Sequence, residues 1–373
     1  MSNSTDLMHN PLQLCLRPEL SELDAYVPFA APEGTLRLDA NESPPLPKSI
    51  SDAIHRAAHT VALERYPDAR ATALRHAIAQ WTQSDPGQLL IGTGSDEVIG
   101  LILSGLSRPR EGRTRAVCLY PTPTFVMYRV SALACGVEPV GVALDAQWDL
   151  DVAALCAAMD EHDPSVIFLA TPNNPTGNRF SRDRIEALIA HSKGRALIVL
   201  DEAYGPFADS DDADLMGAHG NVARLGTLSK IGLAAVRVGW AALPEWLAFE
   251  LDKSRQPFNV DAIAQAMATV ALNAHSESLR AHARGIADAR RALSQALAQR
   301  VGVTVYPSEA NFVWVDVGGD AAHVFEALLA EGVLVRSFHR QGGRLRGCLR
   351  ITVSTEAHHE RLLQSLDRVL SRS

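Results

Sequence analysis

Short apolar segments alternate with helix-period segments over residues 64–240, and this alternation limits the fold more than any other feature. Five segments read as strands, at 89–92 (LLIG), 116–120 (AVCLY), 165–170 (SVIFLA), 196–201 (ALIVLD) and 222–228 (VARLGTL). Helical patterns follow the first three. This order predicts an α/β fold with a large, mostly parallel sheet covered by helices on both faces. Ligands then bind beyond the carboxyl ends of the strands.

A smaller unit is predicted after the sheet. Residues 261–300 are rich in Ala, Leu, Arg and Gln and read as helix almost throughout, which suits a connector between two domains. Strand patterns follow at VTVYP, NFVWVDV and LRITV, and helix patterns at HVFEALLAEG and HHERLLQSLDRVL. We expect a large domain at 64–264, a small α+β domain at 265–373, and an N-terminal arm at 1–63 that partly joins the small domain.

Composition excludes several classes of protein. A net charge of -8 argues against a nucleic-acid partner. The five cysteines are widely spaced without a C-x-x-C pair, so no metal site is predicted. No apolar run is long enough to span a bilayer, and the first residues lack a signal-peptide pattern. We therefore expect a cytoplasmic protein without a membrane partner.

Three motifs at predicted strand ends carry polar groups, but each also has an ordinary structural explanation. GTGSDE (92–97) opens a helix, where backbone N–H groups attract anions. It lacks the third glycine of a dinucleotide fingerprint, which disfavours a nicotinamide-dependent dehydrogenase, and the GK[ST] of a P-loop. TPNNPTG (171–177) is a strong turn sequence, and DEAYGPF (201–207) ends a strand with an acid. None of the three alone decides the function.

Lys230 is unusual in a chain with four lysines and thirty-one arginines. It follows a predicted strand and lies among apolar residues in TLSKIGLAAVRVGW (227–240). Two interpretations are open from the residues alone. Lys230 is either a surface lysine whose stem covers apolar neighbours, or a desolvated amine able to form a Schiff base, a chemistry that arginine cannot perform.

The ordered set of motifs resembles a known family. GTGSDE, PTPTFVMY, PNNPTG, DEAY and SKIGLAAVRVG occur in the order typical of fold-type I (class II) aminotransferases that depend on pyridoxal 5′-phosphate (PLP). With LDANESP, RYPD, SEANF, GVLVRSF and GCLRITV, the set resembles the histidinol-phosphate aminotransferase family in particular. The likeness covers nearly the whole chain.

The resemblance implies a role for each residue around the cofactor ring. Lys230 would be the catalytic residue, attached to PLP and then free to move a proton. Asp201 would keep the pyridine nitrogen protonated, so that the ring can accept electrons. Asn174 and Tyr204 would donate hydrogen bonds to the ring oxygen, and Phe125 would stack on the ring.

The same resemblance assigns the cofactor phosphate to a second group of residues. The backbone of Ser95 and Asp96, at a helix N-terminus, would bind it together with the Ser229 hydroxyl and the Arg237 guanidinium. Thr227 would contribute a further hydroxyl.

The remaining implied roles concern the partner subunit and the substrate. Tyr66 in RYP would reach the phosphate from the neighbouring subunit, which implies a homodimer with shared active sites. Arg350 would bind a substrate carboxylate, and Arg336 with Arg350 the phosphate of the second substrate. Tyr26 would close the site from the arm, and Asn41 in LDANESP is a further candidate substrate contact.

The implied reaction is transamination of L-histidinol phosphate with 2-oxoglutarate to imidazole-acetol phosphate and L-glutamate, in histidine biosynthesis. The chain departs from the usual text of the family in NESPPLP, where N-E-N-P is commoner, and in AAVR, where A-G-L-R is commoner. Three alternatives are an aromatic amino-acid aminotransferase, a phosphothreonine decarboxylase-like enzyme, and a non-catalytic protein that binds PLP as a ligand.

Overall fold

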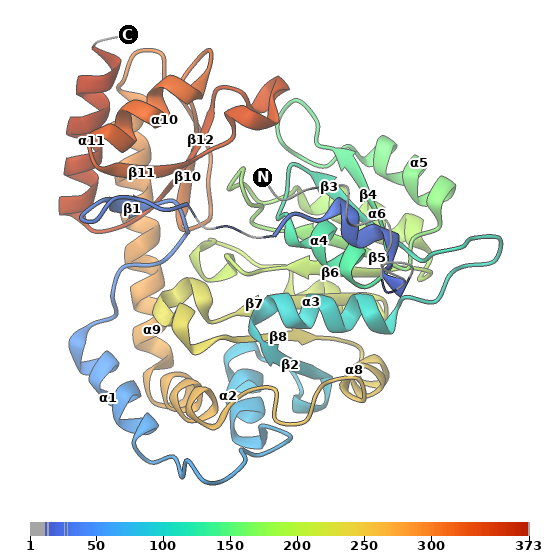
Figure 1. The fold of residues 1–373 in the computed structure, drawn as a ribbon. Helices are drawn as coiled ribbons and strands as arrows, with labels where there is room; N and C mark the ends of the chain where they lie inside the picture. The colour runs from blue at the N-terminus through green and yellow to red at the C-terminus, as the bar shows by residue number, and fades with distance from the viewer. Residues whose placement is uncertain (1–11, 13–14, 26, 28, 372–373) are drawn as a thin grey trace.

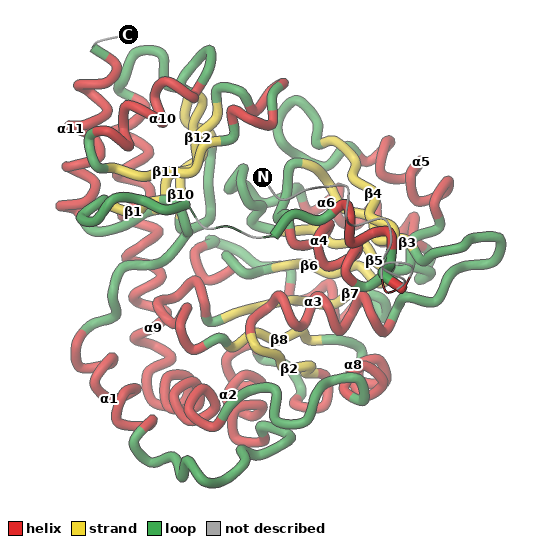
Figure 2. Tube along the Cα trace, in the orientation of Figure 1, coloured by secondary structure: helices red, strands yellow, loops and turns green. Residues whose placement is uncertain are grey.

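The structure, a computed structural model, describes residues 12, 15–25, 27 and 29–371. Within these residues the chain forms a seven-stranded sheet and a five-stranded sheet (Figure 1). Helices pack against both sheets, as the colours of Figure 2 show. No helix in the described part of the chain is long and apolar enough to cross a membrane.

The seven-stranded sheet has the order β2-β8-β7-β6-β5-β3-β4. All its strands run parallel except β8, which is antiparallel to both neighbours. The strands are β2 (Leu89–Thr93), β3 (Val117–Thr122), β4 (Glu138–Ala143), β5 (Val166–Ala170), β6 (Leu197–Asp201), β7 (Val222–Thr227) and β8 (Val238–Ala242). The mostly parallel α/β fold is confirmed, although β4 and β8 were not predicted. The strand order reverses between β3 and β5, the point at which such sheets bind ligands.

Helices cover both faces of this sheet. One face is covered by α3 (Gly94–Gly105), α4 (Met127–Ala134) and α8 (Glu245–Asp252). The other is covered by α5 (Val152–His162), α6 (Arg182–Ser192) and α7 (Ala213–Ala218), with α2 (Thr72–Thr82) and part of α9 over β8. On β5, Phe168 packs toward α3 and α4, whereas Ile167 and Leu169 pack toward α5 and α6. Burial on both sides explains the uninterrupted apolar run in SVIFLA.

The five-stranded sheet has the order β1-β11-β12-β10-β9. Its strands are β1 (Leu36–Leu38), β9 (Thr304–Tyr306), β10 (Phe312–Asp316), β11 (Val333–Ser337) and β12 (Cys348–Thr352). The N-terminal arm contributes β1, which pairs in parallel with β11, while the other pairs are antiparallel. Helices α10 (Ala321–Ala330) and α11 (Glu356–Leu370) complete this unit.

The long helix α9 (Ala262–Ala298) contacts both units, and Figure 1 shows it running from α1 and α2 to the second sheet. Its regular geometry is interrupted at His275, where φ is -132°. One part packs against α1 (Lys48–Ala58) and α2, and the remainder against β9, β10 and α11. The predicted helix over 261–300 is therefore confirmed. The division into domains at residue 264, in the first turn of α9, stays a prediction.

Candidate active site

Ten of the eleven residues predicted to contact a cofactor line a single pocket of about 530 Å³. They are Ser95, Asp96, Phe125, Asn174, Asp201, Tyr204, Thr227, Ser229, Lys230 and Arg237. The pocket lies at the carboxyl ends of β5, β6 and β7 and at the N-terminus of α3. Parallel strands end at one edge of a sheet, which is why residues spread over 143 positions of sequence, from 95 to 237, meet here.

Asp201, the last residue of β6, is a buried carboxylate held in a fixed direction. Its Oδ2 accepts a hydrogen bond of 2.6 Å from the Tyr128 hydroxyl, and its Oδ1 accepts one of 3.0 Å from the Ala203 N–H. Burial raises the pKa of Asp201 to about 6, although both hydrogen bonds oppose the change. A carboxylate desolvated in this way gains strongly from a cationic N–H group placed beside it.

Tyr128 is the site residue that sequence analysis missed. Its ring is fully buried, stacks on Phe168 at a centroid distance of 4.8 Å, and meets the Phe125 ring edge-on at 5.7 Å. Burial keeps the pKa of its hydroxyl well above the usual value, so it stays a donor to Asp201. The available signal was the spacing in PTFVMY, where Tyr128 follows Phe125 by one helical turn.

Lys230 lies in a tight helical turn, η6 (Ser229–Leu233), directly after β7. Its Nζ is 5.8 Å from the centre of the Tyr204 ring. The N-terminal arm fixes this turn, because the Ser43 hydroxyl donates a hydrogen bond to the Lys230 carbonyl. Gly232 has φ of +92°, and a side chain there would meet Leu46 of the arm. The amine is thus half-buried inside the pocket rather than spread over the surface.

Arg237 and the N-terminus of α3 form the opposite end of the pocket. The guanidinium lies over Gly94, since a Cβ at Gly94 would stand 2.5 Å from Arg237 Nη2. Arg237 also donates to Ser229 Oγ at 3.4 Å and lies 3.7 Å from the Asp96 carboxylate. Strand β8 approaches closely because Gly239 has no side chain to overlap the backbone of the α3 N-terminus. Helix N–H groups, a guanidinium and a hydroxyl together suit a phosphate.

Thr227 supports this end through Ser229. Its Oγ1 accepts a hydrogen bond of 3.1 Å from the Ser229 N–H and lies 3.0 Å from Ser229 Oγ. The Thr227 side chain is buried and also lies 3.1 Å from the Val238 carbonyl oxygen. The Thr227 hydroxyl is therefore used within the protein, where it fixes the position of the Ser229 hydroxyl.

The rim of the pocket joins the two sheets through Arg350 on β12. Arg350 Nη1 donates to Asn174 Oδ1 at 2.5 Å, and Nη2 donates to the Asp39 carbonyl at 2.6 Å. Because a guanidinium can only donate, the Asn174 Nδ2 group is left to donate elsewhere. Burial lowers the pKa of Arg350 to about 10, and no carboxylate of the described chain lies within ion-pair distance. A buried cation with neutral acceptors suits an incoming anion.

Asn41 is buried beside Tyr204 and not at an open surface. Its φ is +55°, and its Nδ2 donates to the Tyr204 hydroxyl at 2.9 Å. Its backbone is held by Thr352 at 3.0 Å and by Asn311 at 2.9 Å. The predicted substrate contact is untested, and the structure instead places Asn41 as a donor that orients Tyr204.

Two predicted site residues, Arg336 and Tyr66, do not line this pocket, and a third is not among the described residues. Arg336 is exposed on β11 and pairs in register with Arg350, so the two guanidinium-bearing side chains extend from one face of the sheet. Tyr66 is 82% exposed and stacks on Phe258 at a centroid distance of 4.7 Å, well apart from the pocket of its own chain. Tyr26 lies outside the described residues.

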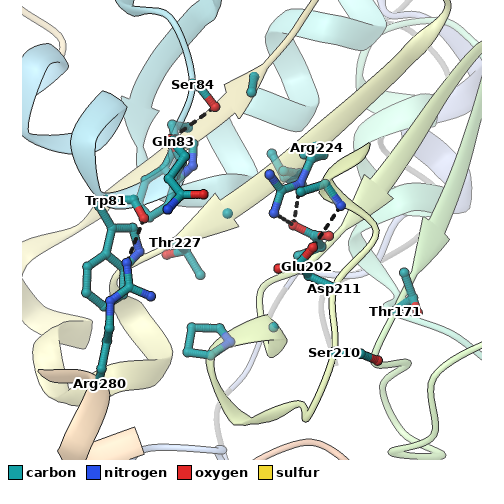
Figure 3. A pocket seen from close by; sticks show the side chains of 18 of the residues that line it. Trp81, Gln83, Ser84, Thr171, Glu202, Ser210, Asp211, Arg224, Thr227 and Arg280 are labelled. Carbon is teal, nitrogen blue, oxygen red and sulfur yellow. Dashed lines mark hydrogen bonds and ion pairs between the residues drawn. The ribbon is translucent and has the colours of Figure 1, made fainter. Parts of the chain in front are cut away.

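A larger cleft, of about 1350 Å³, opens on the sheet face that α2 and α9 cover (Figure 3). Two of its charged groups are paired with each other: Arg224 bonds Glu202 at 2.8 Å. On the facing wall, Arg280 stacks on the Trp81 ring at 4.1 Å. Of the predicted site residues, only Thr227 lines this cleft. The chemistry of the lining residues, rather than the size of the cavity, therefore identifies the site.

Comparisons with known proteins agree with this geometry. Residues 33–366 match the family Aminotransferase class I and II. Histidinol-phosphate aminotransferase of Chromobacterium violaceum is 39% identical, over 96% of this chain and 98% of the relative. Histidinol-phosphate aminotransferase 1 of Ralstonia nicotianae is 40% identical, over 94% and 93%. The crystal structure of histidinol-phosphate aminotransferase from Sinorhizobium meliloti in complex with pyridoxal-5′-phosphate superposes with a TM-score of 0.83 at 27% identity, over 96% and 98%.

The chain belongs to the class I and II aminotransferases, and the predicted fold-type I architecture is confirmed. Within that family, full-length relatives at 39% and 40% identity are histidinol-phosphate aminotransferases, so the chain belongs to their group. The resemblance found in the motif order is therefore confirmed.

Replacing Asp201 with Asn changes how stability depends on pH in the cofactor-free protein. The native pKa of about 6 lies above the ordinary 3.8, so the native state binds more protons between these values and loses stability as pH rises through them. Across this range the free energy of unfolding falls by about 3 kcal/mol. We expect Asp201→Asn to gain stability relative to wild type from pH 4 to pH 7, measured as urea midpoints. Asp288→Asn, an exposed carboxylate on α9, should show no such trend; equal trends in both variants would contradict the assignment.

Proposed function

We propose that the protein catalyses PLP-dependent transamination of L-histidinol phosphate with 2-oxoglutarate, giving imidazole-acetol phosphate and L-glutamate, in histidine biosynthesis. The observation that carries the proposal is the meeting of Lys230, Asp201 and Arg237 in one pocket. It is supported by full-length relatives at 39–40% identity that are histidinol-phosphate aminotransferases.

The side chains of the pocket fit PLP by their chemistry. Asp201 is a buried carboxylate suited to a protonated pyridine nitrogen, and burial has already raised its pKa to about 6. Arg237 and the α3 N-terminus suit the phosphate, and Phe125 offers an aromatic surface between them. Lys230 supplies the amine that binds the aldehyde. When bound, PLP provides an electron sink for the electron pair released at the α-carbon of the substrate.

The protein groups then orient the reactants and move one proton. Asp201, itself fixed by Tyr128, would hold a proton on the pyridine nitrogen. Tyr204, oriented by Asn41, would donate a hydrogen bond to the ring oxygen, as would the Nδ2 group of Asn174. The Nζ of Lys230 would accept the proton from the substrate α-carbon as general base and then return it as general acid to the carbon that carried the aldehyde.

Two arginines of the second sheet bind the substrates in this proposal. Arg350 is buried at the rim and presents its guanidinium to the carboxylate of glutamate or 2-oxoglutarate, for which a two-pronged donor is a good match. Arg336, opposite it on β11, extends the positive charge outward and binds the phosphate of histidinol phosphate. Tyr26 is proposed to close the site from the arm.

We also propose that the active protein is a homodimer with shared sites. Tyr66 is 82% exposed, and Leu63 (81%), Phe258 (37%) and Ile263 (40%) add apolar surface on neighbouring segments of chain. An exposed apolar patch of this kind is typical of a subunit interface. A second copy docked there would bring Tyr66 to the phosphate of its partner.

A cytoplasmic location is proposed as well. The five cysteines, Cys15, Cys118, Cys135, Cys156 and Cys348, are free thiols. Proteins kept in a reducing compartment rarely carry disulfides, so the free thiols are consistent with the cytoplasm.

Lys230→Ala tests the reaction itself. We expect wild-type protein with PLP to absorb visible light, and borohydride to abolish that band and label Lys230. The variant should lose at least about 10³-fold in kcat, because it lacks the proton-transferring amine. Lys253→Ala, an exposed lysine paired with Glu250 at 2.6 Å, is the matched control. Full activity of Lys230→Ala would refute the proposal.

Arg336→Gln tests the choice of substrate. We expect wild type to prefer histidinol phosphate over phenylalanine, tyrosine and phosphothreonine in kcat/KM. The variant should lose about 10²-fold for histidinol phosphate but change by less than about threefold for phenylalanine, which has no phosphate to bind. Arg340→Gln, another exposed arginine in the segment that follows β11, should retain the preference. Equal wild-type activity on phenylalanine would favour the aromatic aminotransferase instead.

Hybrid dimers test the shared site. Lys230→Ala and Tyr66→Ala homodimers should each be weakly active, because every site lacks one of the two residues. Mixing them with subunit exchange gives hybrids that contain one complete site, so activity should recover to about a quarter of wild type. Sedimentation would verify the dimer and the exchange. Exchange without recovery would place Tyr66 outside the partner's site.

A further inference from the structure

Trp148, in the loop between β4 and α5, packs into the five-stranded sheet. Its φ is +63°, and its side chain is 5% exposed. The ring meets Tyr306 of β9 edge-on at 6.1 Å and Trp314 of β10 at 6.3 Å. Trp314 in turn meets Phe338 edge-on at 5.0 Å. Trp148 thus lies in a loop of the seven-stranded unit, but its side chain also packs against the five-stranded sheet.

Arg344 also binds the loop between β4 and α5. It lies in the turn η9 (Gly343–Leu345) between β11 and β12, and its guanidinium is 3.8 Å from the centre of the Trp148 ring. It donates hydrogen bonds to the carbonyl oxygens of Leu144 at 3.4 Å, Asp145 at 2.7 Å and Ala146 at 3.0 Å. One planar group therefore joins the β11–β12 turn to the β4–α5 loop.

The Arg344 contacts depend on shape and not on charge pairing. The carboxylate of Asp145, whose carbonyl Arg344 contacts, is bonded instead to Arg184 at 2.5 Å. Arg344 therefore meets neutral carbonyl groups and an aromatic face. A planar fork of donors can satisfy three carbonyls while stacking on an indole, but the ammonium of a lysine cannot do both.

The β4–α5 loop that Arg344 contacts is bonded to the loop that meets Arg350 at the rim of the active site. The Trp148 carbonyl accepts a hydrogen bond of 2.9 Å from Asn178, directly after the NNPTG motif. Asn174 in that motif accepts the 2.5 Å hydrogen bond from Arg350, six residues after Arg344. The segment from Arg344 to Arg350 therefore contacts two neighbouring loops, the β4–α5 loop through Arg344 and the NNPTG loop through Arg350, and the Asn178–Trp148 hydrogen bond joins those loops to each other.

We propose that Arg344, stacked on Trp148, is a positioning residue that sets Arg350 where it binds the carboxylate of the substrate. The inference rests on the proposed function, in which Arg350 holds that carboxylate. Arg344 does not line the active-site pocket. Its effect passes through the short chain segment to β12, and a displacement of about 1 Å at such a group weakens productive binding severely.

The test measures binding of glutarate, a dicarboxylate that lacks a reacting group, to PLP-loaded enzyme by the change in cofactor absorbance. We expect Arg344→Ala to raise both the Kd for glutarate and the Michaelis constant for the 2-oxoglutarate substrate about tenfold. The value of kcat should stay within twofold, and the thermal midpoint should not change. Arg344→Lys should lose as much, because it keeps the charge without the planar fork.

Two comparisons separate positioning from a general structural role. Arg346→Ala is the matched control: Arg346 is exposed in the same segment but pairs with Asp320 at 3.1 Å, within its own unit. It should leave the Kd for glutarate unchanged. In an Arg350→Lys background, Arg344→Ala should add less than twofold, because the residue through which it acts is already impaired.

The full pattern of losses supports the proposal. An unchanged Kd in Arg344→Ala, recovery in Arg344→Lys, or an undiminished tenfold effect in the Arg350→Lys background would each overturn it. Failure of wild type to transaminate histidinol phosphate would reject the proposed function separately, since glutarate binding reports on Arg350 without turnover.

Discussion

The burial of a single carboxylate, Asp201, organises the site. An ionised acid inside a protein is costly unless it is hydrogen-bonded and faces a cation, and here Tyr128 and a backbone N–H supply only the first requirement. In the proposed function, a protonated ring nitrogen would supply the cation and relieve the remaining cost. Binding and protonation of the cofactor would then be coupled, and the sheet that buries Asp201 would contribute to both.

The rest of the structure arranges groups around that fixed point. The parallel strands deliver Asn174, Asp201 and Thr227 to one edge, and α3 adds its N-terminus from the face it covers. The N-terminal arm and β12 come from the other unit, and they hold the Lys230 turn and place Arg350. In the proposed function, residues of the large sheet hold the cofactor, whereas selection of the substrate depends on how the smaller sheet packs against it.

Much of this could be predicted from sequence, because the fold and the cofactor site rest on local patterns. Apolar strands with polar ends placed Asp201 and Lys230 among the candidates, and only the resemblance in motif order gave these residues and Arg237 their implied roles. Tyr128 was not predicted as a site residue, because its hydroxyl reaches Asp201 only through the packing of α4 on the sheet. Strand β8 was not predicted, because its sequence overlaps the TLSKIGLAAVRVGW motif, which was interpreted only for its site residues. Contacts such as Asn41 with Tyr204, 163 positions apart, follow from tertiary packing alone.

The side-chain alternation of β6 has a further consequence for how this enzyme can change. Asp201 points into the active-site pocket and the next residue, Glu202, into the cleft on the far face, where it pairs with Arg224. A one-residue insertion or deletion upstream in β6 would exchange the two acids between the faces. The two acids therefore fix the register of this strand, and the start of the following loop is constrained as well, because Ala203 and Tyr204 line the same pocket.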